Sequence, residues 1–240
     1  LCKNYVSMEY KNRIADKLLR DKLEAMGAVL IEGPKACGKT TTAEQQAKSI
    51  IYMDDPVKQE QYKQMAQTNI RFLLEGETPR LIDEWQHVPQ FWDAIRFEVD
   101  HRDDDGQFML TGSAVPADMK EIHHTGTGRY GWLTMRPMSL WESGESTGEV
   151  SLSDLFLTPD RIGALNKLTL PMLAFAACRG GWPKSLQKKT EKAALSQVTE
   201  YYKAITNSDI SRVDNVKRDE ERAKRIMRSY ARHQGSQASI

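Results

Sequence analysis

Gly33-Pro34-Lys35-Ala36-Cys37-Gly38-Lys39-Thr40 is the stretch of this 240-residue sequence that decides its fold. It matches the pattern G-x-x-x-x-G-K-[ST], in which glycines let backbone N–H groups wrap a phosphate and the lysine reaches it with a positive charge. The alternative is a glycine-rich turn in which Thr40 caps a helix. Ordinary residue usage would produce the full pattern by chance in about one chain of this length in a hundred. The stretch therefore predicts a phosphate-binding loop.

The residues on either side of this loop support the same prediction. Residues 28–31 form an unbroken apolar run, the pattern of a strand that is buried on both faces of a parallel sheet. Ala43 and Ala47 then mark a helix, whose positive end would point at the phosphates. We predict that Lys39 binds the β and γ phosphates of ATP and that Thr40 ligates Mg²⁺. The predicted nucleotide-binding residues are Gly33, Pro34, Lys35, Ala36, Cys37, Gly38, Lys39, Thr40 and Thr41.

A second stretch, Leu81-Ile82-Asp83-Glu84, is a short apolar strand that ends in two acids. This arrangement allows Asp83 to hold Mg²⁺ and Glu84 to polarise a water molecule beside the terminal phosphate. Without the loop upstream, a strand end whose aspartate caps the next helix would be an equally good explanation. Glu84 also favours hydrolysis over phosphotransfer, because nucleotide kinases and small GTPases generally lack a carboxylate at this position.

Strands alternate with helices through the first 142 residues, which predicts an α/β fold of three layers. The predicted strands are residues 28–31, 50–53, 81–83, 108–110 and 132–135. A helix precedes them, because helical spacing before Gly27 is kept by Ile14, Leu18, Leu19, Leu23 and Met26. We therefore expect a mostly parallel five-stranded sheet, followed by a small helical region.

The composition along the chain predicts five parts. These are an N-terminal arm and helix (1–27), the core (28–142), a linker rich in Ser, Gly and Glu (143–153), a helical lid-like region (154–200) and the start of an incomplete C-terminal helical domain (201–240). Helical spacing in the last two parts is kept by Ile162, Leu165 and Leu168, by Leu195, Val198, Tyr202 and Ile205, and by Ala223, Ile226, Met227 and Tyr230. Because the sequence begins with Leu rather than Met, we expect it to be a fragment.

The overall composition argues against several classes of protein. Lys and Arg (34) nearly balance Asp and Glu (33), and a formal charge of +1 gives no global attraction to nucleic acid or anionic lipid. No apolar run approaches the ~20 residues that span a bilayer, so we expect a cytoplasmic protein without membrane contact. The three cysteines lack CxxC spacing, which argues against a disulfide framework and against a zinc site. The adjacent pair His123-His124 does not favour a metal site either, because neighbouring side chains do not converge on one ion.

Four further residues are weaker candidates for the site. Thr111 and Ser113 end the fourth strand and could hold the attacking water or sense the γ phosphate, although Thr and Ser also suit an ordinary turn. Arg129 precedes the fifth strand in a loop that could reach a neighbouring subunit's nucleotide, with a solvated loop as an equal alternative. Arg179 could reach the phosphates from the helical region. A helix-ending turn with a packed tryptophan is the better explanation of residues 178–183.

The motifs of this sequence resemble those of prokaryotic AAA-type P-loop ATPases, in which an AAA-like domain is followed by a C-terminal domain of unknown function. The resemblance is carried by GAVLIEGPKACGKTTTA (27–43), LIDEWQ (81–86), GQFMLTGSAVP (106–116), GRYGWLTMRPMSLWESGES (128–146) and RGGWP (179–183). It implies a three-layer P-loop NTPase fold of AAA type, in which the strand of Leu110 lies between the strand before the loop and the strand of Asp83.

The same resemblance implies roles for individual residues. These are a Walker A loop at residues 33–40, Walker B acids at Asp83 and Glu84, a first sensor at Thr111 or Ser113, and an arginine finger at Arg129. Members of the family continue well beyond the last residue of this sequence. Most of the C-terminal domain, and with it any output of that domain, is therefore expected to be missing.

Three functions are compatible with these residues. The first is Mg²⁺-dependent binding and hydrolysis of ATP that drives a conformational switch or motor, with nucleotide sites shared in a homo-oligomer. The second is a module that holds nucleotide without turnover and recruits protein or DNA through its C-terminal region, against which Glu84 argues. The third, phosphotransfer to a small molecule, would need a basic mobile lid, and Lys and Arg are not clustered in such a segment. No guanine-reading N-K-x-D motif occurs in the sequence, but its absence does not decide between ATP and GTP.

Overall fold

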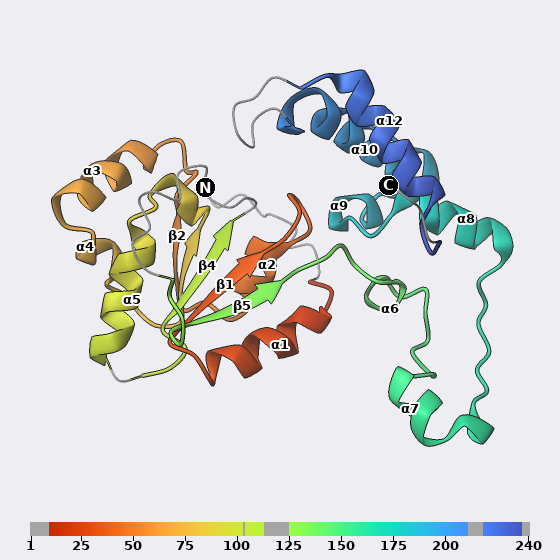
Figure 1. The fold of residues 1–240 in the computed structure, drawn as a ribbon, viewed down its shortest axis with the longest axis horizontal. Helices are drawn as coiled ribbons and strands as arrows, with labels where there is room; N and C mark the ends of the chain where they lie inside the picture. The colour runs from red at the N-terminus through yellow and green to blue at the C-terminus, as the bar shows by residue number, and fades with distance from the viewer. Residues whose placement is uncertain (1–9, 103, 113–124, 211–217, 237–240) are drawn as a thin grey trace, which may run out of the picture.

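The computed structural model describes residues 10–102, 104–112, 125–210 and 218–236, and its centre is a five-stranded sheet (Figure 1). The strands are β1 (Ala28–Glu32), β2 (Ser49–Tyr52), β3 (Arg80–Asp83), β4 (Phe108–Gly112) and β5 (Tyr130–Thr134). All pairings are parallel, in the order β2-β3-β4-β1-β5. The predicted fold class is confirmed, and the strand of Leu110 lies between β1 and β3 as the resemblance implied.

Helices cover both faces of the sheet and complete the three layers (Figure 1). They are α1 (Ile14–Leu23), α2 (Lys39–Glu44), α3 (Gln59–Asn69), α4 (Arg71–Leu74) and α5 (Phe91–Arg102), with a 3₁₀ turn, η1 (Trp85–His87). Leu30 and Leu110 pack into one buried cluster with Phe91 of α5, whereas Val29 lies in a second cluster with Leu19 of α1. Adjacent strand residues thus point to opposite covered faces, which explains why β1 is apolar at every position along residues 28–31.

β5 begins two residues earlier than the sequence predicted. Its first residue, Tyr130, stacks on Trp92 with ring centroids 3.9 Å apart, and its hydroxyl donates to the Trp92 carbonyl at 2.7 Å. Gly131 interrupts the apolar pattern and hid this start. A Cβ at Gly131 would lie 3.3 Å from Cγ of Met26, so the glycine allows the chain after α1 to approach the strand closely.

After the sheet the chain is largely helical, but one predicted helix is wrong. The elements are α6 (Leu140–Ser143), α7 (Leu152–Leu157), η3 (Pro159–Arg161), α8 (Leu170–Arg179), α9 (Pro183–Leu186), α10 (Glu191–Ala204), η4 (Ile205–Asp209) and α12 (Glu220–Arg232). Residues 162–169, where the spacing of three apolar residues predicted a helix, are not helical. Leu165 is 89% exposed, so a helix there would have no surface on which to bury its apolar stripe. Gly163 lowers the stability of a helix further.

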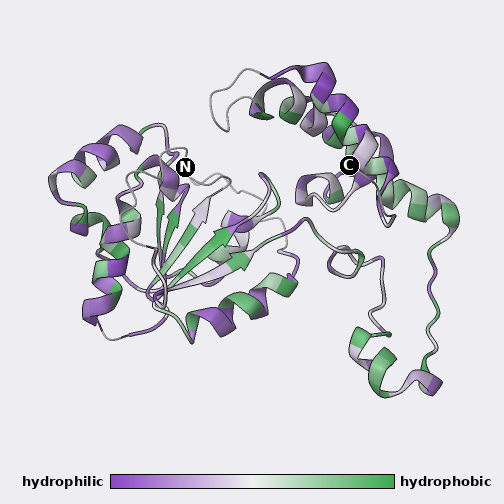
Figure 2. Cartoon of the chain, viewed as in Figure 1, coloured by the Kyte–Doolittle hydropathy of each residue, from purple (hydrophilic) through white to green (hydrophobic). Residues whose placement is uncertain are grey.

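The apolar residues concentrate on the strands and on the helix faces that cover them (Figure 2). α7 and the segment after it are different, because Phe156, Leu157 and Leu165 are all exposed. No helix among the described residues is both long and apolar enough to cross a membrane.

The central position of β4 leads to a prediction about stability. Leu110 is fully buried in this strand, so Leu110→Ala should lower the free energy of unfolding by about 2–5 kcal/mol, because it leaves a cavity between two packed layers. Leu165→Ala is the matched control and should change it by less than about 0.5 kcal/mol, because that side chain is exposed. Urea denaturation of both variants measures the difference, and equal stability of the two would contradict the assignment of the core.

Candidate phosphate-binding site

The glycine-rich loop connects β1 to α2 at the carboxyl edge of the sheet. Gly33 and Gly38 have φ values of 149° and 104°, which side chains rarely permit. At Gly33 a Cβ would lie 2.2 Å from the carbonyl oxygen of Met135, so only glycine fits there. Ala36 is also left-handed, with φ at 63°. The loop is therefore wound tightly against the end of β5.

Lys39 lies inside this loop and is only 6% exposed. Its Nζ donates to the carbonyl oxygens of Gly33 at 2.9 Å and Pro34 at 3.1 Å. An ammonium group has three donors, and within the described residues two of them are used. The third donor and the positive charge remain for an anion, so the structure fits a phosphate at this position.

Asp83 joins the loop to the sheet. Its Oδ1 accepts a hydrogen bond from the Thr40 hydroxyl at 2.7 Å and another from the Thr111 hydroxyl. Thr111 is opposite Asp83 in the register of β3 and β4, so the two side chains meet at the same edge of the sheet. Hydroxyl and carboxylate oxygens are the ligands that Mg²⁺ prefers. The residues predicted to hold the metal, Thr40 and Asp83, are thus in contact and of suitable chemistry.

Burial raises the pKa of Asp83, although the hydroxyls of Thr111 and Thr40 stabilise its carboxylate. The negative charges of Glu84 and Asp54 raise the pKa further. The charged form of Asp83 is therefore less stable in the folded protein than in water. A cation beside this carboxylate would remove that penalty, which is a second reason that the site suits Mg²⁺.

Glu84 follows Asp83 directly and has a left-handed backbone, with φ at 54° and ψ at 45°. Among the described residues, Glu84 and Ala36 are the non-glycine residues with positive φ, and both belong to this site. Such conformations cost about 1–3 kcal/mol each and are typical of functional sites. The Glu84 side chain is half-buried and accepts a hydrogen bond from Nε2 of Gln86.

Arg13 supports the loop from outside, a role that no sequence pattern predicted. Its guanidinium donates to the carbonyl oxygens of Cys37 at 3.0 Å and Arg136 at 2.7 Å, and to Oε1 of Glu142 at 2.9 Å. Burial alone would raise the pKa of Glu142, but backbone N–H groups and Arg13 outweigh it and hold that pKa below its usual value. Ser139 and Glu142 form a capping box at α6, a pattern that the sequence does contain.

The C-terminal helices contact the loop from another side. The Tyr201 hydroxyl, on α10, donates to the carbonyl oxygen of Lys35 at 2.8 Å, and Lys35 Nζ lies 3.8 Å from Oδ1 of Asp209. The Tyr201 ring packs against Trp182, with centroids 4.4 Å apart. These contacts place the region after α9 against the loop, and no sequence pattern predicted them.

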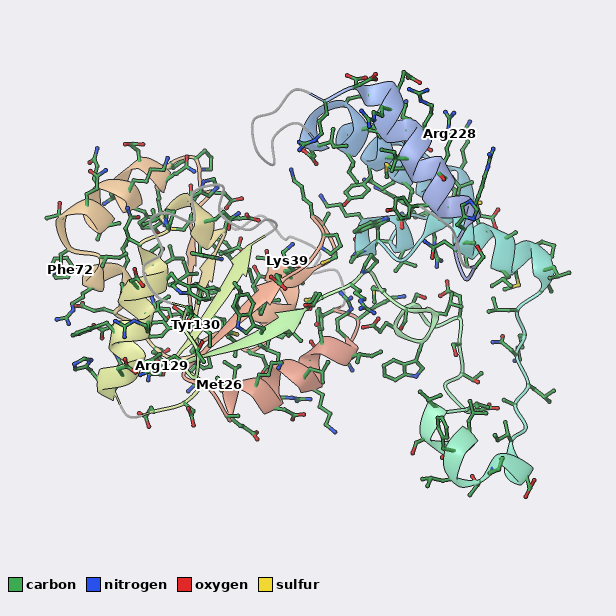
Figure 3. The ribbon with its side chains drawn as sticks, in the orientation of Figure 1. Met26, Lys39, Phe72, Arg129, Tyr130 and Arg228 are labelled. Carbon is green, nitrogen blue, oxygen red and sulfur yellow. The ribbon has the colours of Figure 1, made fainter. Side chains whose placement is uncertain are left out.

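Arg129 lies away from the loop, and Arg179 pairs with residues outside it. The Arg129 carbonyl accepts from the N–H of Ala28, at the start of β1, so Arg129 is at the opposite edge of the sheet from Lys39 (Figure 3). Its Nε donates to Oδ1 of Asp100 at 2.7 Å. Arg179 is buried at the end of α8 and pairs with Glu145 at 2.6 Å, as expected of a helix-ending turn. Ser113 and the His123-His124 pair lie outside the described residues.

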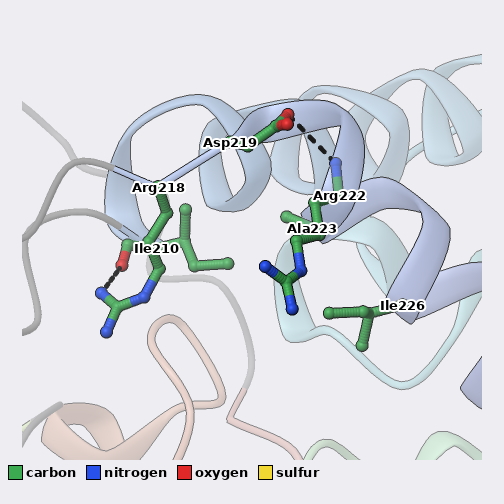
Figure 4. A pocket seen from close by; sticks show the side chains of 6 residues that line it. All are labelled: Ile210, Arg218, Asp219, Arg222, Ala223 and Ile226. Atoms are coloured by element: carbon green, nitrogen blue, oxygen red, sulfur yellow. Dashed lines mark hydrogen bonds between the residues drawn. The ribbon is translucent and has the colours of Figure 1, made fainter.

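A cavity of about 380 Å³ lies elsewhere, beside α12 (Figure 4). It is lined by Ile210, Arg218, Asp219, Arg222, Ala223 and Ile226. Asp219 caps α12 by accepting from the backbone N–H of Arg222, and Arg218 donates to the Ile210 carbonyl. None of these residues belongs to the predicted site. The described part of the chain also contains no cluster of three His, Cys, Asp or Glu residues that could hold a metal.

Comparison with known proteins relates two parts of the chain to families. Residues 26–143 match the family model of an AAA domain, and residues 171–240 match a domain of unknown function (DUF8612). No curated protein matches the sequence. Among solved structures, a Walker-type ATPase of Pyrococcus abyssi is similar with a TM-score of 0.49 and 11% identity, over 86% of this chain and 76% of that one. PCH-2 of C. elegans is similar with a TM-score of 0.38 and 16% identity, over 78% of this chain and 66% of that one.

The buried charge of Asp83 leads to a prediction about pH. Because the folded protein raises the pKa of Asp83, its carboxylate destabilises the fold at neutral pH, and this penalty disappears as the carboxyl group becomes protonated. Asp83→Asn should therefore stabilise the ligand-free protein at pH 7 by about 1 kcal/mol, or about 2–4 °C in Tm. The gain should shrink as the pH falls through the raised pKa of Asp83, and it should be gone below about pH 4, where an aspartate is protonated in the unfolded chain as well.

Asp21→Asn is the control for this prediction, because Asp21 is an exposed aspartate on α1. Asp21→Asn should leave Tm unchanged both at pH 7 and below about pH 4. Thermal denaturation across pH measures both variants. A lower Tm for Asp83→Asn at neutral pH would mean that the carboxylate stabilises the ligand-free fold, contrary to the prediction.

Proposed function

We propose that this chain binds Mg·ATP at the loop of residues 33–41 and hydrolyses it to ADP and phosphate. The observation that carries the proposal is the meeting of Thr40 and Thr111 on one oxygen of Asp83, together with the buried Lys39, which uses two of its three donors within the described residues. The AAA-domain match supports it, because residues 26–143 include the loop and both acids.

Each residue would contribute one part of the chemistry. Lys39 would bind the β and γ phosphates, and Thr40 with Asp83 would hold Mg²⁺, which neutralises phosphate charge when bound. Glu84 would accept a proton from water as the water oxygen bonds to the γ phosphorus and the bond from that phosphorus to the β–γ bridging oxygen breaks. The proton then resides on Glu84, and ADP and phosphate are the products. Thr111, through Asp83, would register whether the γ phosphate is present.

The output of hydrolysis would be a change in the position of the C-terminal helices. Tyr201 binds the Lys35 carbonyl, so a movement of the loop on hydrolysis would reach α10 directly. We propose that residues 154–200, which include most of α10, act as a lid that follows this movement. Residues 143–153 join this lid to the core. The alternative function is a module that keeps its nucleotide and recruits protein or DNA through the same helices. The two functions differ in whether ATP is turned over.

Two variants distinguish hydrolysis from simple nucleotide retention. Lys39→Ala should abolish ATP binding, because the ammonium is lost from a loop that otherwise offers mainly backbone dipoles. Glu84→Gln should keep ATP affinity within about twofold and lower turnover by at least about 100-fold, because an amide cannot accept the proton. Titration with labelled ATP and phosphate release measure the two effects.

The outcomes have separate meanings. Full ATP affinity in Lys39→Ala would reject the binding site. Tight ATP binding by the wild-type chain without phosphate release would favour the retention module. Unchanged turnover in Glu84→Gln would move the water-activating role to another residue.

Arg129 leads to a further prediction, which concerns a shared site. Because it lies at the opposite edge of its own sheet and is exposed, we propose that it acts on the nucleotide of a neighbouring copy. Arg129→Ala should then lower turnover about 10³-fold or more with little loss of ATP affinity. Mixing Arg129→Ala with the inactive Lys39→Ala variant should restore part of the activity. The first variant supplies an intact loop, and the second supplies an intact Arg129 to that loop.

Arg20→Ala is the control for this experiment, since Arg20 is an exposed arginine on α1. Turnover should also rise with protein concentration if sites are shared. Turnover that is independent of concentration and of Arg129 would leave the pairing with Asp100 as the purpose of this side chain.

A further inference from the structure

Gln86 lies in η1, two residues after Glu84, and its side-chain amide reaches back to that carboxylate. Nε2 of Gln86 donates a hydrogen bond to Oε2 of Glu84. An ionised carboxylate only accepts hydrogen bonds, so the contact fixes which end of the amide faces Glu84. The carbonyl end, Oε1, must point the other way.

That carbonyl oxygen is buried and has no hydrogen-bond donor within the described residues. It lies over Gly112, the last residue of β4, where a Cβ would be 2.5 Å from Oε1 and 3.3 Å from Cδ of Gln86. An unmatched buried carbonyl costs about 1–3 kcal/mol. The amide of Gln86 therefore occupies a place that a side chain without polar atoms would fill at lower cost.

Two unfavourable features thus meet at one carboxylate. Glu84 has a left-handed backbone, and the amide that binds its side chain has a buried oxygen without a partner among the residues described. Neither feature contributes to the stability of the sheet. Both restrict the position of Glu84, whose side chain would otherwise rotate about three bonds and spread its carboxylate over several places.

We propose that Gln86 is a positioning residue, whose amide holds the Glu84 carboxylate where it accepts the proton of the attacking water. Gly112 provides the space that the amide occupies. The inference rests on the hydrolysis proposed above, and it assigns to the residue after Trp85 a role that the sequence motifs did not. A displacement of a catalytic group by about 1 Å can cost on the order of 100-fold in rate, so the effect of losing this contact is measurable.

Gln86→Met tests the proposal, because methionine has the same length and no amide. We expect kcat for phosphate release to fall about 10- to 100-fold, with the dissociation constant for ATPγS within about twofold of wild type and Tm equal or higher. Gln90→Met is the matched control, since Gln90 is an exposed glutamine between η1 and α5. It should leave kcat, affinity and Tm unchanged.

Gly112→Ala tests the same contact without altering Gln86. The added Cβ would fill the place of Oε1, and the atom that it displaces is the end of a flexible side chain, so the fold should persist. We expect the same pattern as for Gln86→Met: lower kcat, with ATPγS affinity and Tm close to wild type. Agreement between the two variants would assign the effect to the position of the amide.

Three results would overturn the inference. If wild type turns over ATP and Gln86→Met does so at the same rate, the inference fails and the proposed hydrolysis stands. If Gln86→Met loses turnover, ATPγS affinity and Tm together, the residue is structural. If wild type binds ATPγS but releases no phosphate from ATP, the proposed hydrolysis fails and the role of Gln86 fails with it.

Discussion

Oδ1 of Asp83 accepts hydrogen bonds from Thr40 at the start of α2 and from Thr111 at the end of β4, and the geometry of the site depends on this junction. It requires β4 to lie beside β3, and the loop after β1 to lie beside β4, which is the order the sheet has. Because parallel strands end at the same edge, side chains from separate segments meet there without any chain segment crossing the sheet. The position of Glu84 follows, since it is the next residue after the junction.

The site contains features that work against stability, and the sheet compensates for them. Ala36 and Glu84 have left-handed backbones, and Asp83 is a buried acid with a raised pKa. Within the part of the chain that the structure describes, the buried Oε1 of Gln86 has no hydrogen-bond partner. The strands stabilise the fold against these costs, because their side chains are buried on both faces of the sheet in two apolar clusters. This division is common in proteins, in which local rules are broken at functional sites and obeyed elsewhere.

Segments from before and from after the sheet contact the loop. Arg13 binds the Cys37 carbonyl, and Tyr201 binds the Lys35 carbonyl two residues earlier. A change in the loop backbone must therefore break these hydrogen bonds or move the groups that make them. Arg13 also binds Glu142 at α6, where the chain leaves the sheet for the C-terminal helices. Arg13 thus connects the phosphate-binding loop to the point where the chain passes from the sheet to the C-terminal helices.

The sequence by itself predicted the loop, the five strands, the strand end that carries the two acids, and the helices α1, α2, α10 and α12, because each depends on a short local pattern. Only the tertiary structure decided the pairing of Arg13 with Glu142, which are 129 positions apart, the seat of the Gln86 amide on Gly112, and the distance of Arg129 from its own loop. It also decided that residues 162–169 form no helix, because an apolar stripe makes a helix only where a surface covers it. Local patterns record backbone geometry and burial, whereas the partner of a side chain depends on which distant segment the fold brings beside it.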